Sequence, residues 1–206
     1  MKQKLLLLTT LFSILLLAAC NQQPDTPTTA VADTGVNYVP FSDETLGLAL
    51  VYPEDWTVRT VFGGLTVASN QSVIDANSLA ELGENGFVNY IPGELGVFNL
   101  QTGQNFTAND ALIILGVYKQ LLEREGQTFE VVEPGHSLDI EAQSSGMMVL
   151  KSTEDGESLI TILAVIINED YVALISAASL ESSAAAMRPI FDHIIESTLV
   201  SFPVLN

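Results

Sequence analysis

Cysteine and basic residues are scarce in this sequence, and each shortage excludes a class of protein. Cys20 is the single cysteine among 206 residues, so one chain can form neither a disulfide framework nor a Cys-x-x-Cys zinc site. Only 7 residues are Lys or Arg, against 25 that are Asp or Glu, and the basic ones are not clustered. Because a phosphate backbone is bound through clustered Lys and Arg, we expect no nucleic-acid partner.

The chain is rich in apolar residues and poor in charge. Apolar residues make up 48% of it and charged residues 16%, which excludes disorder over most of its length. The length fits one folded domain with shorter flanking segments. We interpret the net charge of -18 as a source of solubility, with an acidic binding patch as the alternative.

The N-terminus has the pattern of a secretory signal peptide over residues 1–19. Lys2 and Lys4 make its start positive, residues 5–17 form an apolar run, and Ala18 and Ala19 are small residues before Cys20. This run is shorter than the roughly 20 residues that a helix needs to cross a bilayer. The pattern therefore predicts a cleaved signal peptide rather than a membrane span.

Residues 17–20, Leu-Ala-Ala-Cys, resemble the bacterial lipobox. The resemblance implies that the thiol of Cys20 receives a diacylglyceryl group, that the peptide is cut before Cys20, and that the new amino terminus receives a fatty acid such as palmitate. Two or three chains anchor a protein stably, since each buried methylene contributes about 0.8 kcal/mol. The alternative is a small residue beside an ordinary cleavage site. We expect a lipid-anchored protein on the outer face of the cell membrane or, in a host that has one, in the outer membrane.

The segment that follows, residues 20–36 including the lipidated Cys20, is predicted to be a flexible tether. It contains Pro24 and Pro27, no aromatic residue and no apolar periodicity. Cleavage removes Lys2 and Lys4 but no acidic residue, which leaves 25 acidic residues against 5 basic ones, a net charge of -20. Anionic lipid headgroups repel such a body, so the lipid alone should hold the protein at the membrane.

Residues 37–206 are predicted to form one domain that opens with an antiparallel meander. Strand patterns cover residues 46–52, 56–61 and 65–69, and Gly63-Gly64 marks a hairpin between the last two. The glycine-rich residues 70–105 predict only a short helix near residues 78–82. Thr107-x-x-Asp110 is a capping pattern, and the apolar residues after it recur at helical spacing up to Gly126.

The second half of the domain predicts further strands and a final helix. The strands are residues 128–132, 138–142, 147–151, 159–167 and 171–179, with turns at residues 154–157 and 168–170. Residues 159–167 are nearly all apolar, so both faces of that strand should be covered. The helix should begin at Ser182 or Ser183 and be kinked or divided at Pro189. This order indicates the α/β (α+β) class, with a central antiparallel sheet and helices on both faces.

Three short patterns resemble the PsbP-like domains. They are Gly47 with a strand leading to Tyr52-Pro53-Glu54-Asp55-Trp56, the hairpin at residues 168–171, and the helix carrying Arg188-Pro189-Ile190-Phe191 and Ile194-Ile195-Glu196-Ser197. The family is named for an extrinsic subunit of photosystem II. The resemblance spans residues 41–202 and implies an α/β/α sandwich whose characterised members stabilise or assist protein complexes. It offers no catalytic residue to carry over.

The sequence contains two candidate acid–base residues, His136 and His193. No other side chain type titrates near neutral pH without a large shift of its pKa. His136 follows Pro134-Gly135 in a predicted loop, and His193 lies on the last helix beside Asp192, which does not face it. Because no nucleophile elbow, zinc motif or phosphate loop is present, we expect both to be ordinary histidines.

Two further groups of residues have a functional and a structural interpretation. Residues 154–157, Glu-Asp-Gly-Glu, are the densest acidic cluster, but they lack the EF-hand spacing and fit a solvated turn. Trp56 and Tyr52 are candidates for a stacking platform, although their strand-turn-strand setting favours core packing. We expect no metal site and no cofactor.

The sequence therefore predicts a membrane-anchored bacterial lipoprotein that acts as a non-catalytic binding or complex-stabilising module. Its partner would be a protein or a small ligand. The alternative is an envelope hydrolase that uses His136 or His193.

Overall fold

The computed structural model describes residues 35–203 except 62, 76–80, 125, 141 and 155. The predicted signal peptide, Cys20 and nearly all of the predicted tether lie outside the described residues. Most of the helix expected at residues 78–82 lies outside them as well. These predictions, and the domain limits, therefore stay predictions.

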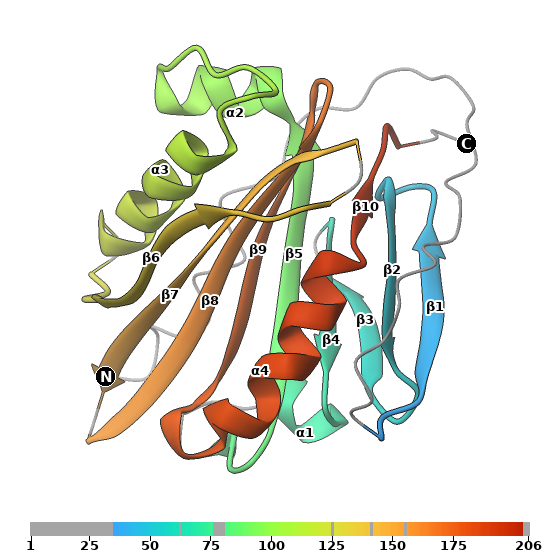
Figure 1. The fold of residues 1–206 in the computed structure, drawn as a ribbon, viewed down its shortest axis with the longest axis vertical. Helices are drawn as coiled ribbons and strands as arrows, with labels where there is room; N and C mark the ends of the chain where they lie inside the picture. The colour runs from blue at the N-terminus through green and yellow to red at the C-terminus, as the bar shows by residue number, and fades with distance from the viewer. Residues whose placement is uncertain are drawn as a thin grey trace.

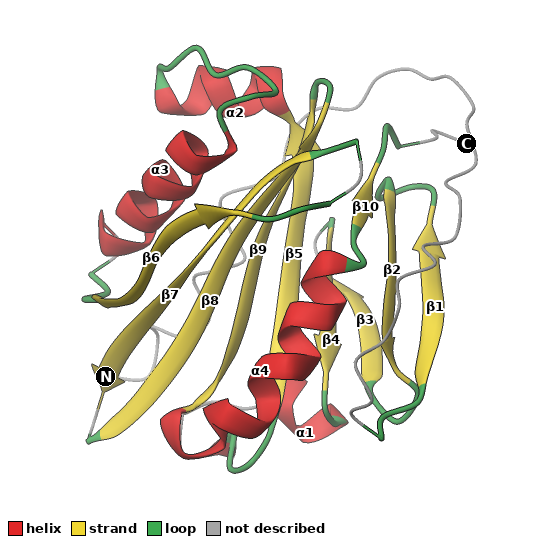
Figure 2. Cartoon of the chain, viewed as in Figure 1, coloured by secondary structure: helices red, strands yellow, loops and turns green. Residues whose placement is uncertain are grey.

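A seven-stranded antiparallel sheet forms the centre of the molecule (Figures 1 and 2). Across the sheet its strands are β3 (Thr57–Val61), β4 (Gly64–Ala68), β5 (Gly86–Glu94), β9 (Tyr171–Leu180), β8 (Glu157–Asn168), β7 (Ser144–Glu154) and β6 (Glu130–Ser137). The predicted hairpins are confirmed at residues 63–64, 154–157 and 168–170.

Helices cover both faces of this sheet, as the sequence predicts. Helices α2 (Leu95–Thr102) and α3 (Ala111–Arg124) pack on one face, and α4 (Glu181–Glu196) packs on the other. The α4 face also carries a second sheet of three strands, β1 (Tyr38–Asp43), β2 (Leu48–Pro53) and β10 (Leu199–Val200). The sequence patterns did not predict this small sheet.

Strand β8 shows why the two layers form. Its residues 161–167 are all buried, because Ile162 and Ile166 point into the core beneath α4 while Leu163 and Val165 point into the core beneath α3. A strand whose side chains alternate between two dry layers must be apolar throughout. The prediction that both faces of this strand are covered is confirmed.

The predicted opening meander is wrong in one respect. Strands β2 and β3 follow each other in sequence but belong to different sheets, and β2 pairs instead with β1 and with β10. The pairing of Leu199 with Ala49 joins residues 150 positions apart, and no local pattern can indicate such a partner. Trp56 lies in the short turn where the chain passes from one sheet to the other.

Residues 70–105 contain structure that the sequence patterns missed. Helix α1 (Gln71–Ile74) is followed by β5 and α2, and β5 pairs with β9 from Gly86↔Ser179 to Glu94↔Tyr171. Glycine and proline are rare inside strands, so their presence in β5 weakens the sequence pattern by which a strand is predicted. Gly86 is needed there for a different reason, since a Cβ at this position would lie 2.6 Å from Cζ of Phe191 on α4.

Three local predictions in the second half also need correction. Residues 138–140 and 142 are not in a strand, and Ala142 has a positive φ of 58°. Helix α4 leaves β9 directly with Leu180 as its N-cap, so Ser183 is already inside the helix and donates to the Leu180 carbonyl. Of the two outcomes expected at Pro189, a kink or a division, the division is wrong, because α4 is one helix from Glu181 to Glu196.

The predicted helix before Gly126 is confirmed as α3. The backbone N–H and hydroxyl of Thr107 both donate to the Asp110 carboxylate, at 2.7 and 2.8 Å. These bonds fix the turn before the helix, which begins at Ala111 and therefore one turn later than a cap at Thr107 would place it. The buried face of the helix contains the residues that the pattern predicts: Ala111, Ile114, Leu115, Tyr118 and Leu122, with Leu121 partly buried.

Gly47 is a position where we expect substitution to be costly. Its φ is +61°, and a Cβ there would overlap the Ser201 carbonyl oxygen, because Ser201 N–H donates to Gly47 O at 2.8 Å. Gly47→Ala should lower the free energy of unfolding by more than about 2 kcal/mol, since strain and overlap add. Gly103→Ala is the control, with a φ of +68° and no atom within 4 Å. Equal losses in urea titrations of the two variants would refute the role of the close contact.

Candidate functional site

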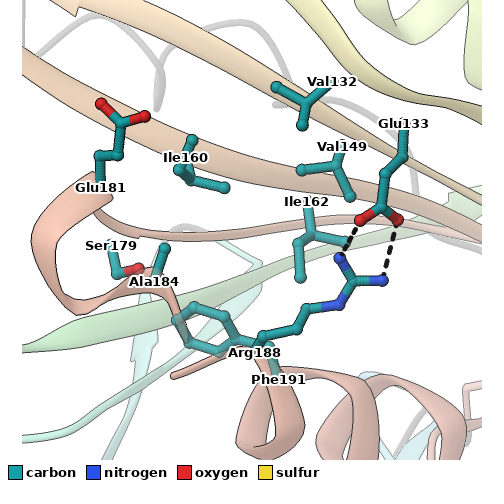
Figure 3. A pocket seen from close by; sticks show the side chains of 10 residues that line it. All are labelled: Val132, Glu133, Val149, Ile160, Ile162, Ser179, Glu181, Ala184, Arg188 and Phe191. Atoms are coloured by element: carbon teal, nitrogen blue, oxygen red, sulfur yellow. Dashed lines mark hydrogen bonds and ion pairs between the residues drawn. The ribbon is translucent and has the colours of Figure 1, made fainter. Parts of the chain in front are cut away.

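A pocket of about 260 Å³ lies between α4 and strands β6 to β9 of the large sheet (Figure 3). Six of its lining residues are apolar and four are polar or charged. They are Val132, Val149, Ile160, Ile162, Ala184 and Phe191, with Glu133, Ser179, Glu181 and Arg188. Because these residues come from separate segments of the chain, the pocket exists only in the folded protein.

Secondary-structure periodicity places these side chains on the pocket. On α4, Ala184, Arg188 and Phe191 are spaced by four and three residues and therefore share one face of the helix. Strand β8 contributes Ile160 and Ile162, two residues apart on the same face of the sheet. Strand β6 is an edge strand with two register shifts, which lie on either side of Glu133. Such irregularities bend a strand and redirect its side chains.

An ion pair closes one side of the pocket. Arg188 donates through both terminal nitrogens to Glu133, at 2.8 and 3.1 Å, and through Nε to both oxygens of Asp192, at 2.7 Å. Figure 3 shows the fork of Arg188 facing the Glu133 carboxylate. This arrangement ties α4 to the edge strand and engages the guanidinium of Arg188 on two sides.

The two carboxylates respond to Arg188 differently. Hydrogen bonds from Arg188 hold the pKa of Glu133 below its ordinary value, and nearby His136 adds to this effect in a smaller way. Burial raises the pKa of Asp192, although Arg188 opposes the shift. Burial and the neighbouring Asp192 also raise the pKa of Glu196. The carboxylates of Glu133, Asp192 and Glu196 thus all lie near the guanidinium of Arg188.

Ser179 contributes a buried hydroxyl to the pocket. The residue is 1% exposed, and its Oγ has no hydrogen-bond partner among the described residues. Leaving a buried polar group unpaired costs about 1 to 3 kcal/mol, so such groups are rare in folded proteins. Ser179 is the feature of the pocket that the fold itself does not explain.

Glu181 lies at the same end of the pocket as Ser179, where β9 leads into α4 (Figure 3). Lys151 on β7 donates to both of its carboxylate oxygens at 2.7 Å. This hydrogen bonding holds the pKa of Glu181 below its ordinary value. Both side chains are partly exposed, so the pair contributes little to stability and can exchange partners.

Neither candidate histidine lines the pocket. His136 is exposed in β6 rather than in the predicted loop, because an edge strand with bulges tolerates Pro134 and Gly135. Its Nδ1 lies 3.3 Å from the Pro134 carbonyl. His193 is half-buried on α4 and contacts the ring of Tyr38 edge-on, with centroids 4.3 Å apart. Asp192 bonds to Arg188 instead of His193, as helical geometry predicts.

The other candidate residues from the sequence contribute to the core or to a turn. Trp56 is 9% exposed and packs edge-on against Phe191, so the prediction of core packing is confirmed. Tyr52 packs partly buried against the same core. Strand β7 ends at Glu154 and β8 begins at its register partner Glu157, so the chain reverses there as predicted. In the described part of the chain, no three His, Cys, Asp or Glu side chains are grouped as metal ligands, and no helix there is long and apolar enough to cross a membrane.

His193 should make the stability of the protein depend on pH. Burial lowers its pKa below the ordinary value of 6.5, so the unfolded chain takes up the proton first as the pH falls. Stability should therefore decrease below about pH 6.5, and His193→Gln should remove this part of the decrease. Melting temperatures of both proteins at several pH values test this. As the pH is lowered, the melting temperature of His193→Gln should fall less than that of the native protein. Equal falls in the two proteins would contradict the assignment to His193.

Local sequence patterns did not mark Ser179, Glu133 or Arg188 as site residues. Arg188 carried a signal, because it is one of only five basic residues after the predicted cleavage site and has Asp192 four residues along the helix. Ser179 carried no such signal in the sequence. It stands in an apolar strand among small residues, where a serine usually finds a partner.

Comparison with known proteins identifies the fold. No family model and no curated protein matches this chain. Among solved structures, it is similar to cyanobacterial PsbP from Synechocystis sp. PCC 6803, with 14% identity and a TM-score of 0.56, over 90% of this chain and 99% of that one. It is also similar to the Ran-binding protein Mog1p of Saccharomyces cerevisiae, with 12% identity and a TM-score of 0.53, over 81% of this chain and 97% of that one.

Both neighbours are matched over almost their whole length, so the likeness covers the complete fold of each. At these sequence identities, the structural similarity is evidence for the fold alone. The chain has the PsbP-like fold, as its short sequence patterns indicate.

Proposed function

We propose that this protein is a lipid-anchored, non-catalytic binding module of the bacterial cell envelope, and that the pocket beside α4 is its ligand site. The observation that carries the proposal is a pocket with six apolar lining residues and one buried hydroxyl that lacks a partner among the described residues. Ligand sites combine mostly apolar walls with a few placed polar groups. The lipobox-like sequence at Cys20 supports the location.

The shared fold also favours binding. One protein of this fold is named as a Ran-binding protein, so the fold is used to bind a partner elsewhere. The alternative, a hydrolase using His136 or His193, needs a nucleophile within hydrogen-bond reach of the histidine. Neither His136 nor His193 is bonded to Ser179, the hydroxyl that faces the pocket. We therefore favour the binding module over the hydrolase.

Filling the pocket tests the proposal. Ala184→Trp places an indole in the pocket, whereas Ala185→Trp places one at the next, exposed position of α4. The lipidated protein and both variants are captured from their own membrane fraction, and the small molecules and proteins retained are identified by mass spectrometry. We expect a species that the native protein and Ala185→Trp retain and Ala184→Trp loses. The same species from all three would show that the pocket is not the site.

The hydrolase is tested separately with ester, phosphoester, peptide and glycoside reporters. We expect no turnover by the purified protein. Activity that survives purification and disappears in His136→Ala or His193→Ala would overturn the binding proposal.

A further inference from the structure

The chemistry of the pocket restricts what it can bind. Its volume of about 260 Å³ exceeds the roughly 150 Å³ cavity that accepts benzene in another protein, so one ring with a short chain fits. Ile160, Ile162 and Phe191 provide an apolar surface for that body. The polar part of the ligand must then meet Ser179, Glu181 or the Arg188–Glu133 pair.

Arg188 does not offer a site for an anion. Three of its five N–H groups already donate to Glu133 and Asp192, and these two carboxylates offset its charge, so no pair of adjacent N–H groups remains for a carboxylate or phosphate. Glu133, Glu181 and Asp192 outnumber Arg188 and Lys151 at this site, and the chain as a whole has a net charge of -18. An anionic ligand would be repelled and a cation attracted.

At the opposite end of the pocket, the carboxylate of the lining residue Glu181 already bonds to an ammonium group. Nζ of Lys151 donates to both oxygens of Glu181, which lies two residues after Ser179. A ligand ammonium has three donors, enough for Glu181 and for the unpartnered Oγ of Ser179 together. Lys151 reaches Glu181 from the surface and satisfies only the first of these two groups.

We propose that the pocket binds a small apolar primary amine. The ammonium group displaces Lys151 from Glu181 and donates a hydrogen bond to Ser179 Oγ, while the apolar body lies against Ile160, Ile162 and Phe191. This inference rests on the proposed function and adds the chemical class of its ligand. It also explains why a buried hydroxyl remains without a partner in the free protein.

Binding of three matched probes tests the charge preference. Phenylpropylamine, phenylpropanol and phenylpropionate share one apolar body and differ in the head group. They are titrated by calorimetry into the full-length lipidated protein in nanodiscs, with empty nanodiscs as the reference. The amine should bind about tenfold more tightly than the alcohol, as expected for a hydrogen bond that involves a charged group, and the acid should not bind.

Four variants test the residues. Ser179→Ala and Glu181→Gln should each weaken amine binding by about tenfold, whereas Lys151→Gln should strengthen it by removing the competing ammonium. Ser176→Ala is the matched control, because it is a buried serine on the same strand that alternation places on the α3 face. Ser179→Ala should also melt at the same or a higher temperature than the native protein. A purely structural hydroxyl would give a lower melting temperature and no selective loss of the amine.

Several outcomes overturn the inference. They are equal binding of the acid, unchanged amine binding by Ser179→Ala, or no binding by any probe. If no probe binds while Ala184→Trp still removes a species captured from membranes, the amine chemistry is wrong and the pocket remains the ligand site. If Ala184→Trp removes nothing, the proposed function fails independently of these titrations.

Discussion

Replacing Cys20 by alanine is expected to abolish attachment of lipid to this protein. The lipobox-like sequence places the only thiol of the chain directly after two small residues, and only a thiol can receive the diacylglyceryl group in this pathway. Cells expressing the native protein and Cys20→Ala are labelled with a radioactive fatty acid, and the label on each protein is compared. Asn21→Ala keeps the thiol and should keep its label. Undiminished label on Cys20→Ala would refute lipidation at this residue.

The same variant should also leave the membrane. After cleavage the chain has 25 acidic residues against 5 basic ones, so anionic headgroups repel the folded domain instead of holding it. Without an acyl chain on residue 20, the processed chain has no anchor left to oppose this repulsion. Fractionation of cells should therefore find the processed form of Cys20→Ala in the soluble fraction and Asn21→Ala with the membranes.

Local patterns predict those parts of the fold that depend on neighbouring residues. The apolar spacing of α3 and the unbroken apolar run of β8 are both confirmed, since each follows from the period of its own element. The hairpin at residues 168–170 is confirmed for the same reason. Helix spacing and strand alternation depend on residues only a few positions apart.

Non-local pairing accounts for the errors in the predicted fold. Strand β10 pairs with β2, and β5 pairs with β9, across long stretches of sequence. A short apolar segment indicates that it will be buried but not against which strand. For this reason the sequence patterns place β2 in a meander with β3, and they do not reveal β5 within its glycine-rich segment.

The pocket is harder to predict than the fold. Its residues come from five elements, and each one looks ordinary in its own segment. Val149 and Ile160 have the pattern of core positions, and Glu133 that of a surface acid. The property that marks Ser179, a buried hydroxyl with no partner among the described residues, exists only once its neighbours are known. The two histidines, which stand out by residue type, are not among the residues that line the pocket.

Trp56→Ala is expected to destabilise the folded domain more than Gly47→Ala does. The indole is 9% exposed and packs edge-on against Phe191, with ring centroids 6.2 Å apart, in the core shared by α4 and both sheets. Its loss should lower the free energy of unfolding by about 3 to 5 kcal/mol, because a large cavity would remain. Thermal and urea unfolding measure this. Leu100→Ala is the control, as that side chain is 85% exposed and should change stability little.

Trp56 should also affect the shape of the pocket, because Phe191 both contacts Trp56 and lines the pocket. The Phe191 ring lies over Gly86 of β5 on one side, contacts Trp56 edge-on, and lines the pocket. Removing the indole frees the ring to shift into the cavity, so the pocket should lose its shape along with its support. Trp56→Phe retains an aromatic contact and should recover part of both the stability and the ligand binding. An unchanged melting temperature in Trp56→Ala together with lost binding would instead place the indole in contact with the ligand, and the core assignment of Trp56 would then be wrong.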